Sequence, residues 1–168
     1  MIEAIATAIL LGGINTLIDF GTTEYKLEAR PIYLVGRILL ICYIVGTIVG
    51  ARARQLMIGS FSGILIGVLL SGLYHVLLPS LGLGAMVVTW TIFWLGFALL
   101  EALLQDARGA ALAILLGLAA ALLSGLLFYM LPRVWTESDP DQPSYLRLLI
   151  LWTSPFVPGF IVLFWRKG

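Results

Sequence analysis

Residues 59–72 read GSFSGILIGVLLSG, an apolar run in which small residues recur at every fourth position: Gly59, Gly63, Gly67 and Ser71. An α-helix has about 3.6 residues per turn, so steps of four place these residues on one slowly wrapping ridge. A ridge without large side chains leaves a smooth furrow along the helix. In a lipid bilayer, such furrows let two helix backbones approach closely. The meaning of this stretch therefore depends on the solvent in which the chain folds.

The composition indicates a membrane protein. Of the 168 residues, 61% are apolar and 11% are charged, and the mean hydropathy is +1.05. Soluble domains carry fewer apolar and more charged residues than this. The net charge of +1 argues against a nucleic-acid partner, which would require a basic surface. Because Cys42 is the only cysteine and His75 the only histidine, the sequence predicts no intramolecular disulfide, no metal site and no cofactor.

Six stretches are apolar enough to span a bilayer, which requires about 20 residues each. They cover residues 2–20, 32–51, 56–79, 84–105, 109–131 and 145–165. The first begins with Glu3 and has no small-residue cleavage site, so we interpret it as a helix and not as a signal peptide. Pro155 and Pro158 predict a kink in the sixth stretch, or its division into two half-helices. The predicted fold is an all-α membrane protein, with residues 1–168 forming one domain of six transmembrane helices.

Basic residues in the short loops predict the orientation in the membrane. The side of both termini carries Arg52, Arg54, Arg108, Arg166 and Lys167. The other side carries Lys26, Arg30, Arg133 and Arg147. This excess predicts that both termini are cytoplasmic. We expect the protein in the plasma membrane if its source is prokaryotic, and in the endoplasmic reticulum if it is eukaryotic.

Small residues also recur in three other stretches. They are Ala4, Ala8 and Gly12 in the first, Gly46 and Gly50 in the second, and Gly109, Ala113, Gly117, Ala121 and Gly125 in the fifth. Two interpretations are open: the ridges bury one another, or one furrow stays partly unfilled and accepts a lipid. The furrow of residues 59–71 favours a lipid because it leads toward two polar side chains, Tyr74 and His75. Ridges left exposed would favour a homo-oligomer.

The GSFSG segment is not a serine-hydrolase motif, because its central residue is Phe61, with Ser60 and Ser62 on either side. His75 lies thirteen residues beyond Ser62, about 20 Å along the same helix. A hydrolase would need His75 to face another serine, such as Ser124 or Ser154. We therefore predict no catalytic residues and no enzymatic activity.

Polar and aromatic residues inside the spans need a structural or functional reason. Asp19 and Arg37 are expected to pair, unless Arg37 snorkels to the interface. A contact of these residues with a ligand is the remaining alternative. Glu101 is expected to snorkel from the cytoplasmic end of its helix. Trp90 and Trp94 lie four residues apart on one helix face, which suits either core packing or a flat wall for a sterol or an acyl chain. The interfacial aromatic belt is expected to include Trp135, Trp152 and Trp165.

The second half of the chain resembles the Insig family of membrane sterol sensors. The resemblance is carried by WLGFALLEALLQDARGAALAILLGLAAALLSGLLFY, residues 94–129, then an acidic proline loop, then PSYLRLLILWTSPFVPGFIVLFWR, residues 143–166. The shared features are a tight turn at Asp106, a glycine-spaced helix and a Tyr-x-Arg start at Tyr145. The first half matches only in its number of helices.

Membership of this family would imply an intramembrane cavity for a sterol or another hydrophobic ligand, such as diacylglycerol. It would also make Asp106 a partner-binding residue, although Ala107 stands where animal members have an arginine. The animal partner is the sterol-regulated Scap complex. The resemblance implies the lipid-binding fold more strongly than this partner, and the protein partner of this chain stays unknown.

The sequence thus favours a non-enzymatic protein that binds a sterol-like or diacylglycerol-like lipid between the third, fourth and fifth spans. The expected lining residues are Gly63, Gly67, Tyr74, His75, Thr89, Trp90 and Trp94. Replacing Gly67 by leucine is expected to abolish lipid retention without preventing assembly. The alternative is the substrate-binding subunit of a vitamin importer of the energy-coupling-factor type, since Ala4 and Ala8 form an AxxxA pattern like the motif that docks such subunits to their transport partner. A purely structural protein is the third interpretation.

Overall fold

The computed structural model describes residues 1–24, 31–82, 84–104, 110–135 and 145–165, and all of its regular elements are helices. The elements are α1 (Ile2–Glu24), α2 (Pro31–Arg52), α3 (Leu56–Leu81), α4 (Gly84–Leu104), α5 (Ala110–Trp135), α6 (Tyr145–Thr153) and α7 (Phe156–Trp165). Within the described residues, six segments are long and apolar enough to cross a membrane, and the sixth comprises α6 and α7 together. The predicted all-α membrane fold is therefore confirmed.

The division of the sixth span follows from its prolines. Pro155 has no backbone N–H to continue the hydrogen-bond ladder of α6, so the helix ends at Thr153 and α7 starts at Phe156. Pro158 lies in the first turn of α7, where a backbone N–H has no partner within the helix in any case. The Trp94 indole N–H donates to the Pro155 carbonyl oxygen at 3.1 Å. This bond ties α4 to the break between the two half-helices.

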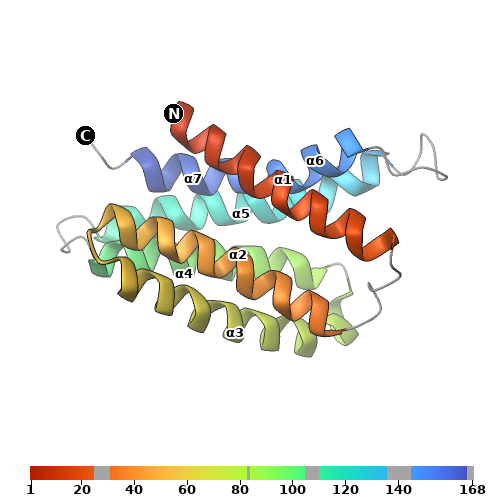
Figure 1. Cartoon of the computed structure of the whole chain (residues 1–168), viewed down its shortest axis with the longest axis horizontal. Helices are drawn as coiled ribbons and strands as arrows, with labels where there is room; N and C mark the ends of the chain where they lie inside the picture. Colours follow the sequence, from red (N-terminus) through yellow and green to blue (C-terminus); the bar gives the residue numbers. More distant parts are fainter. Residues whose placement is uncertain (25–30, 83, 105–109, 136–144, 166–168) are drawn as a thin grey trace.

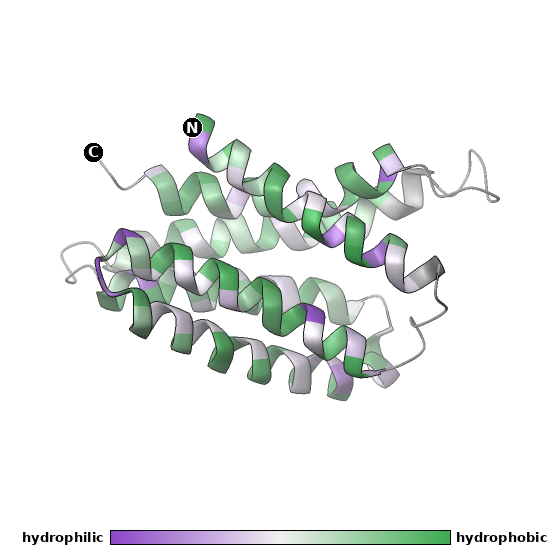
Figure 2. Cartoon of the chain, in the orientation of Figure 1, coloured by the Kyte–Doolittle hydropathy of each residue, from purple (hydrophilic) through white to green (hydrophobic). Residues whose placement is uncertain are grey.

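The helices pack as two hairpins and one helix that lies across the last span (Figure 1). α2 packs mainly against α3, α4 against α5, and α1 against α6 and α7. The start of α1 and the end of α7 lie at one end of the bundle, together with the α2–α3 connection, as an even number of spans requires. Hydrophobic residues cover most of the length of the helices, while hydrophilic residues lie mainly toward their ends (Figure 2). The cytoplasmic location of the termini stays a prediction.

The glycines of α2 and α3 hold these two helices in backbone contact. A Cβ atom on Gly46 would lie 2.7 Å from the Cα of Gly63, and one on Gly50 would lie 2.8 Å from the Cα of Gly59. Real Cβ atoms do not approach other atoms so closely, so no side chain fits at these positions. The furrow of residues 59–71 is therefore filled by α2, which is the first of the two interpretations that the sequence left open.

The other small-residue ridges are also used inside the chain. Ala4 and Ala8 of α1 are fully buried, and Gly12 lies against Thr153. On α5, Gly117 faces Ala98 and Gly125 faces Val87. Gly109 lies outside the described residues, as do the surroundings of Ala113. The ridges described are thus not available to a second copy, and a homo-oligomer stays a prediction without their support.

An aromatic core joins α4 to α7. The ring of Trp94 covers Gly159, where any Cβ atom would overlap it. Trp94 also packs edge-to-face on Phe93 and Phe160, with ring centroids 4.9 and 5.3 Å apart respectively.

One turn before the end of α4, Glu101 is only 2% exposed. The prediction that Glu101 snorkels to the interface is wrong, because neighbouring helices cover the position.

Candidate functional site

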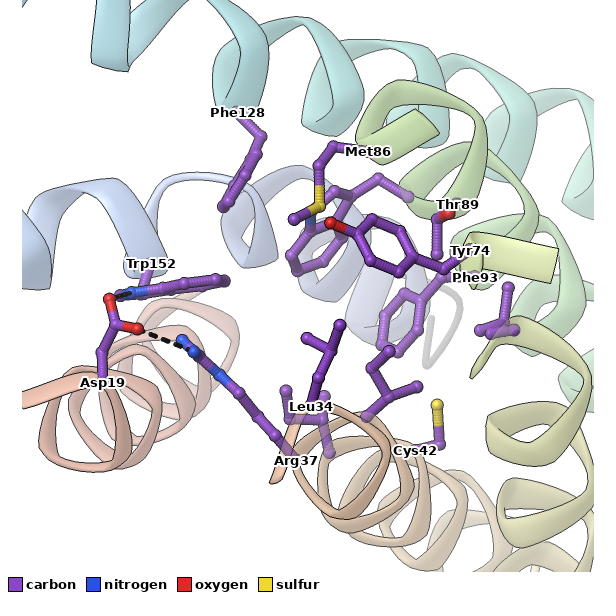
Figure 3. Close-up of a pocket in the computed structure, with 14 residues that line it drawn as sticks. Asp19, Leu34, Arg37, Cys42, Tyr74, Met86, Thr89, Phe93, Phe128 and Trp152 are labelled. Carbon is purple, nitrogen blue, oxygen red and sulfur yellow. Dashed lines mark hydrogen bonds and ion pairs between the residues drawn. The ribbon is translucent and has the colours of Figure 1, made fainter. Parts of the chain in front are cut away.

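A cavity of about 250 Å³ lies in the half of the bundle away from the chain termini (Figure 3). Its lining is mostly apolar and comes from α2, α3, α4, α5 and α6, with Asp19 added from α1. The apolar part includes Ile38 and Ile41 of α2, Leu70 of α3, Trp90 and Phe93 of α4, and Phe128 of α5. The polar lining residues are Asp19, Arg37, Tyr74, Thr89 and Trp152. A small number of polar groups in an apolar concavity is typical of small-molecule sites.

Four side chains form one polar network at the cavity, which we call the Arg37 cluster: Asn15, Asp19, Arg37 and Trp152. The Arg37 guanidinium donates from one terminal nitrogen to Asp19 Oδ1 at 2.8 Å and from Nε to Asn15 Oδ1 at 2.9 Å. The Trp152 indole N–H donates to Asp19 Oδ2 at 2.9 Å. The guanidinium carbon also lies 3.8 Å from the centroid of the Trp152 ring. The predicted pairing of Asp19 with Arg37 is confirmed.

The Arg37 cluster holds one positive and one negative group close together. Arg37 is 11% exposed and Asp19 is 27% exposed, so the ion pair is largely removed from the surface. Charged side chains within membrane spans commonly pair with one another in this way. Trp152 completes the cluster and forms part of the cavity wall, while its place in the interfacial belt stays a prediction.

Two hydroxyl groups face the cavity beyond the Arg37 cluster. The Thr89 hydroxyl donates to the carbonyl oxygen of Ala85, one turn earlier on α4, at 2.7 Å. Its oxygen can still accept a hydrogen bond. Tyr74 is buried, and its hydroxyl lies near Met86 in Figure 3. Within the described residues, the Tyr74 hydroxyl has no hydrogen-bond partner, so it is available to a ligand.

Three of the seven residues that the sequence predicted for the lining are in the cavity wall: Tyr74, Thr89 and Trp90. Gly63 and Gly67 lie instead in the contact of α3 with α2. A Cβ atom on Gly67 would be 3.1 Å from Cys42 Cβ and 3.1 Å from Leu39 Cδ2. Leucine at position 67 would therefore press on α2, and the expectation that Gly67→Leu leaves assembly intact does not fit this packing.

Two other residues predicted for the lining, His75 and Trp94, do not line the cavity. The His75 ring donates from Nδ1 to the Ser71 carbonyl oxygen at 2.8 Å and packs edge-to-face on Tyr74, but His75 does not line the cavity. Trp94 belongs to the aromatic core and not to the lining. Asp106, the predicted partner-binding residue, lies outside the described residues.

The serines form no pair with the histidine in the part of the chain that the structure describes. Ser60 shares a hydrogen bond of 2.8 Å with Thr47 of α2. Ser154 donates to the carbonyl oxygen of Ile150 at 2.6 Å. Among the described residues, His75 makes its one hydrogen bond to the Ser71 carbonyl oxygen. These contacts account for Ser60, Ser154 and His75 by helix packing and by bonds to the backbone.

Sequence reasoning missed the contribution of α2 and α6 to the cavity. It favoured a structural role over a ligand contact for Asp19 and Arg37, and it considered Trp152 only as an interfacial residue. The usable signal was the presence of two charged residues within apolar spans, because such residues commonly mark functional sites in membranes. Phe128 gave no comparable signal, since it lies in a long apolar run.

The chain matches no known protein-family model, no curated protein and no solved structure. The resemblance to the Insig family therefore stays a prediction that rests on the residues quoted above.

Proposed function

We propose that this integral membrane protein binds an uncharged, hydroxyl-bearing lipid, sterol-like or diacylglycerol-like, in the cavity beside the Arg37 cluster, and that it acts without catalysis. The observation that carries the proposal is one apolar cavity with polar groups only on part of its wall. An amphiphile has the same division, with a polar head at one end of a hydrocarbon body.

The apolar lining and the size of the cavity support a lipid over a polar solute. Aromatic and aliphatic side chains such as Ile41, Leu70 and Phe93 make up most of the wall. A polar vitamin would lose its hydration here and gain few hydrogen bonds. The volume of about 250 Å³ lies just under the range of about 300–1,000 Å³ that is common for ligand pockets. The cavity thus suits the head and the adjoining part of a lipid, whose remainder lies along the helices.

The balance of charge in the Arg37 cluster supports an uncharged head group. Asp19 already neutralises Arg37 at 2.8 Å, so an anionic lipid would compete with Asp19 and not meet an open positive charge. The Tyr74 hydroxyl can donate a hydrogen bond, and the Thr89 oxygen can accept one. Together they suit a hydroxyl group, which both donates and accepts.

Mass spectrometry of the lipids retained after mild solubilisation tests the ligand class directly. We expect a sterol or a diacylglycerol at near-stoichiometric amounts. Retention of phospholipids alone, in the proportions of the source membrane, would contradict the proposal.

Filling the cavity should remove the lipid without unfolding the protein. Thr89→Phe adds a ring to the cavity wall, and overpacking of a filled site costs about 1–3 kcal/mol. We therefore expect the retained lipid to fall by about fivefold or more. Thr91→Phe is the matched control, because Thr91 is also on α4 and also donates to the carbonyl one turn earlier, at 2.8 Å, but does not line the cavity. Equal lipid content in the two variants, measured per mole of folded protein, would argue against the site.

Removal of a single hydroxyl tests the polar contact. Tyr74→Phe keeps the ring in the cavity wall and deletes only the group without a partner among the described residues. The loss of one hydrogen bond is worth about 0.5–1.5 kcal/mol, so we expect a several-fold weaker binding of diacylglycerol in a competition assay. Unchanged affinity would mean that the head group lies elsewhere.

The importer interpretation is weakened because the AxxxA motif is not accessible in the folded chain. Ala4 and Ala8 are both fully buried, so the AxxxA face cannot meet a transport partner while α1 packs on the last span. Copurification of an ATPase module with a water-soluble ligand would nevertheless favour the importer over the lipid-binding protein.

A further inference from the structure

The contact between α1 and α2 differs from the other contacts of neighbouring helices. α1 packs mainly on α6 and α7, whereas α2 packs mainly on α3. Between α1 and α2 lies an open groove of about 400 Å³, with Ile18 on one side and Ile32, Tyr33, Gly36 and Leu40 on the other. Ile32 is 74% exposed. Because these residues belong to membrane-spanning helices, the groove faces the lipid.

Arg37 lies in the wall of this groove and also in the wall of the inner cavity. Its guanidinium reaches from α2 to Asp19 and Asn15 of α1, and Figure 3 shows the bond to Asp19. The α2–α3 contact is closed by backbone against backbone. Between α1 and α2, by contrast, a long side chain with several rotatable bonds separates the cavity from the lipid face.

We propose that lipid enters the cavity sideways from the bilayer, through the α1–α2 groove, with the Arg37 side chain as the gate. This inference rests on the proposed function. A lipid that follows this route keeps its acyl chain in hydrocarbon throughout, whereas a route from either aqueous end would expose the chain to water. When Arg37 turns aside, groove and cavity become continuous, and the ion pair with Asp19 closes the passage again.

Gly36 allows the groove to be filled without disturbing the protein. It is exposed, and a Cβ atom there would have no atom within 4 Å. The series Gly36→Ala, Gly36→Leu and Gly36→Trp therefore narrows the groove in steps. Gly72→Trp on α3 is the matched control, since Gly72 is equally exposed and equally free of neighbours but lies away from the groove.

The experiment follows uptake of deuterated 1,2-dioleoylglycerol from liposomes into the reconstituted protein by native mass spectrometry over time. We expect progressively slower uptake along the Gly36 series, roughly tenfold slower for Gly36→Trp than for Gly72→Trp, as a modest rise in the barrier would give. The final occupancy should be the same in all variants, because the cavity itself is unchanged.

Two results would overturn the inference in different ways. Equal uptake rates in Gly36→Trp, Gly72→Trp and the unmodified protein, with equal final occupancy, would refute the route and leave the proposed function standing. Absence of labelled lipid from every protein at equilibrium would refute the proposed function and the route together.

Discussion

Gly46→Leu is expected to prevent the α2–α3 hairpin from closing and to leave little folded protein. A Cβ atom at position 46 would lie 2.7 Å from the Cα of Gly63 and still closer to the carbonyl oxygen of Gly59. Both are backbone atoms, so no side-chain rotation can relieve the overlap and the helices must separate. Overpacking costs about 1–3 kcal/mol where side chains can adjust, and we expect the loss of unfolding free energy to exceed this range.

The matched control for Gly46→Leu is Gly72→Leu, on the lipid face of α3, where a Cβ atom meets nothing within 4 Å. We expect this control to behave like the unmodified protein in size-exclusion chromatography and in thermal unfolding in mild detergent. If the two leucine variants were equally stable, the close backbone contact of α2 with α3 would be refuted.

Arg37→Leu is expected to lower the unfolding free energy by about 2–3 kcal/mol. Removing one partner of a buried ion pair costs about 3–5 kcal/mol, and the 27% exposure of Asp19 reduces this penalty. The main cause is the Asp19 carboxyl group, which stays in an apolar span and loses the guanidinium 2.8 Å away. Unfolding in mixed micelles with increasing denaturing detergent measures the difference.

The double variant Asp19→Leu with Arg37→Leu separates the ion pair from the packing of its side chains. Replacing both charges by apolar groups of similar size is often neutral or stabilising. We expect the double variant to regain most of the stability that Arg37→Leu loses, which gives a favourable coupling energy in the four-protein cycle. Additive losses would mean that Asp19 and Arg37 contribute independently of their contact.

The choice among adjacent residues shows why the cavity could not be located from the sequence. Tyr74 lines the cavity while His75 does not, because consecutive helix residues point about 100° apart. Trp90 and Trp94 share one face of α4 and both contact α7, Trp90 at Phe156 and Trp94 at Gly159, yet only Trp90 lines the cavity. The helical period shows which residues share a face of one helix, but it does not predict which face packs against a neighbouring helix.

The sequence by itself determined that six segments are long and apolar enough to span a membrane, that prolines interrupt the sixth, and that glycine ridges bring helices together. Hydropathy, proline chemistry and the size of glycine act within one segment and so can be read locally. The tertiary structure decided that α2 fills the furrow of α3 and that the remaining space lies beside Arg37. That space is the volume that the side chains of several helices leave unfilled. Its position depends on all of these helices together, so it cannot be predicted from any single segment.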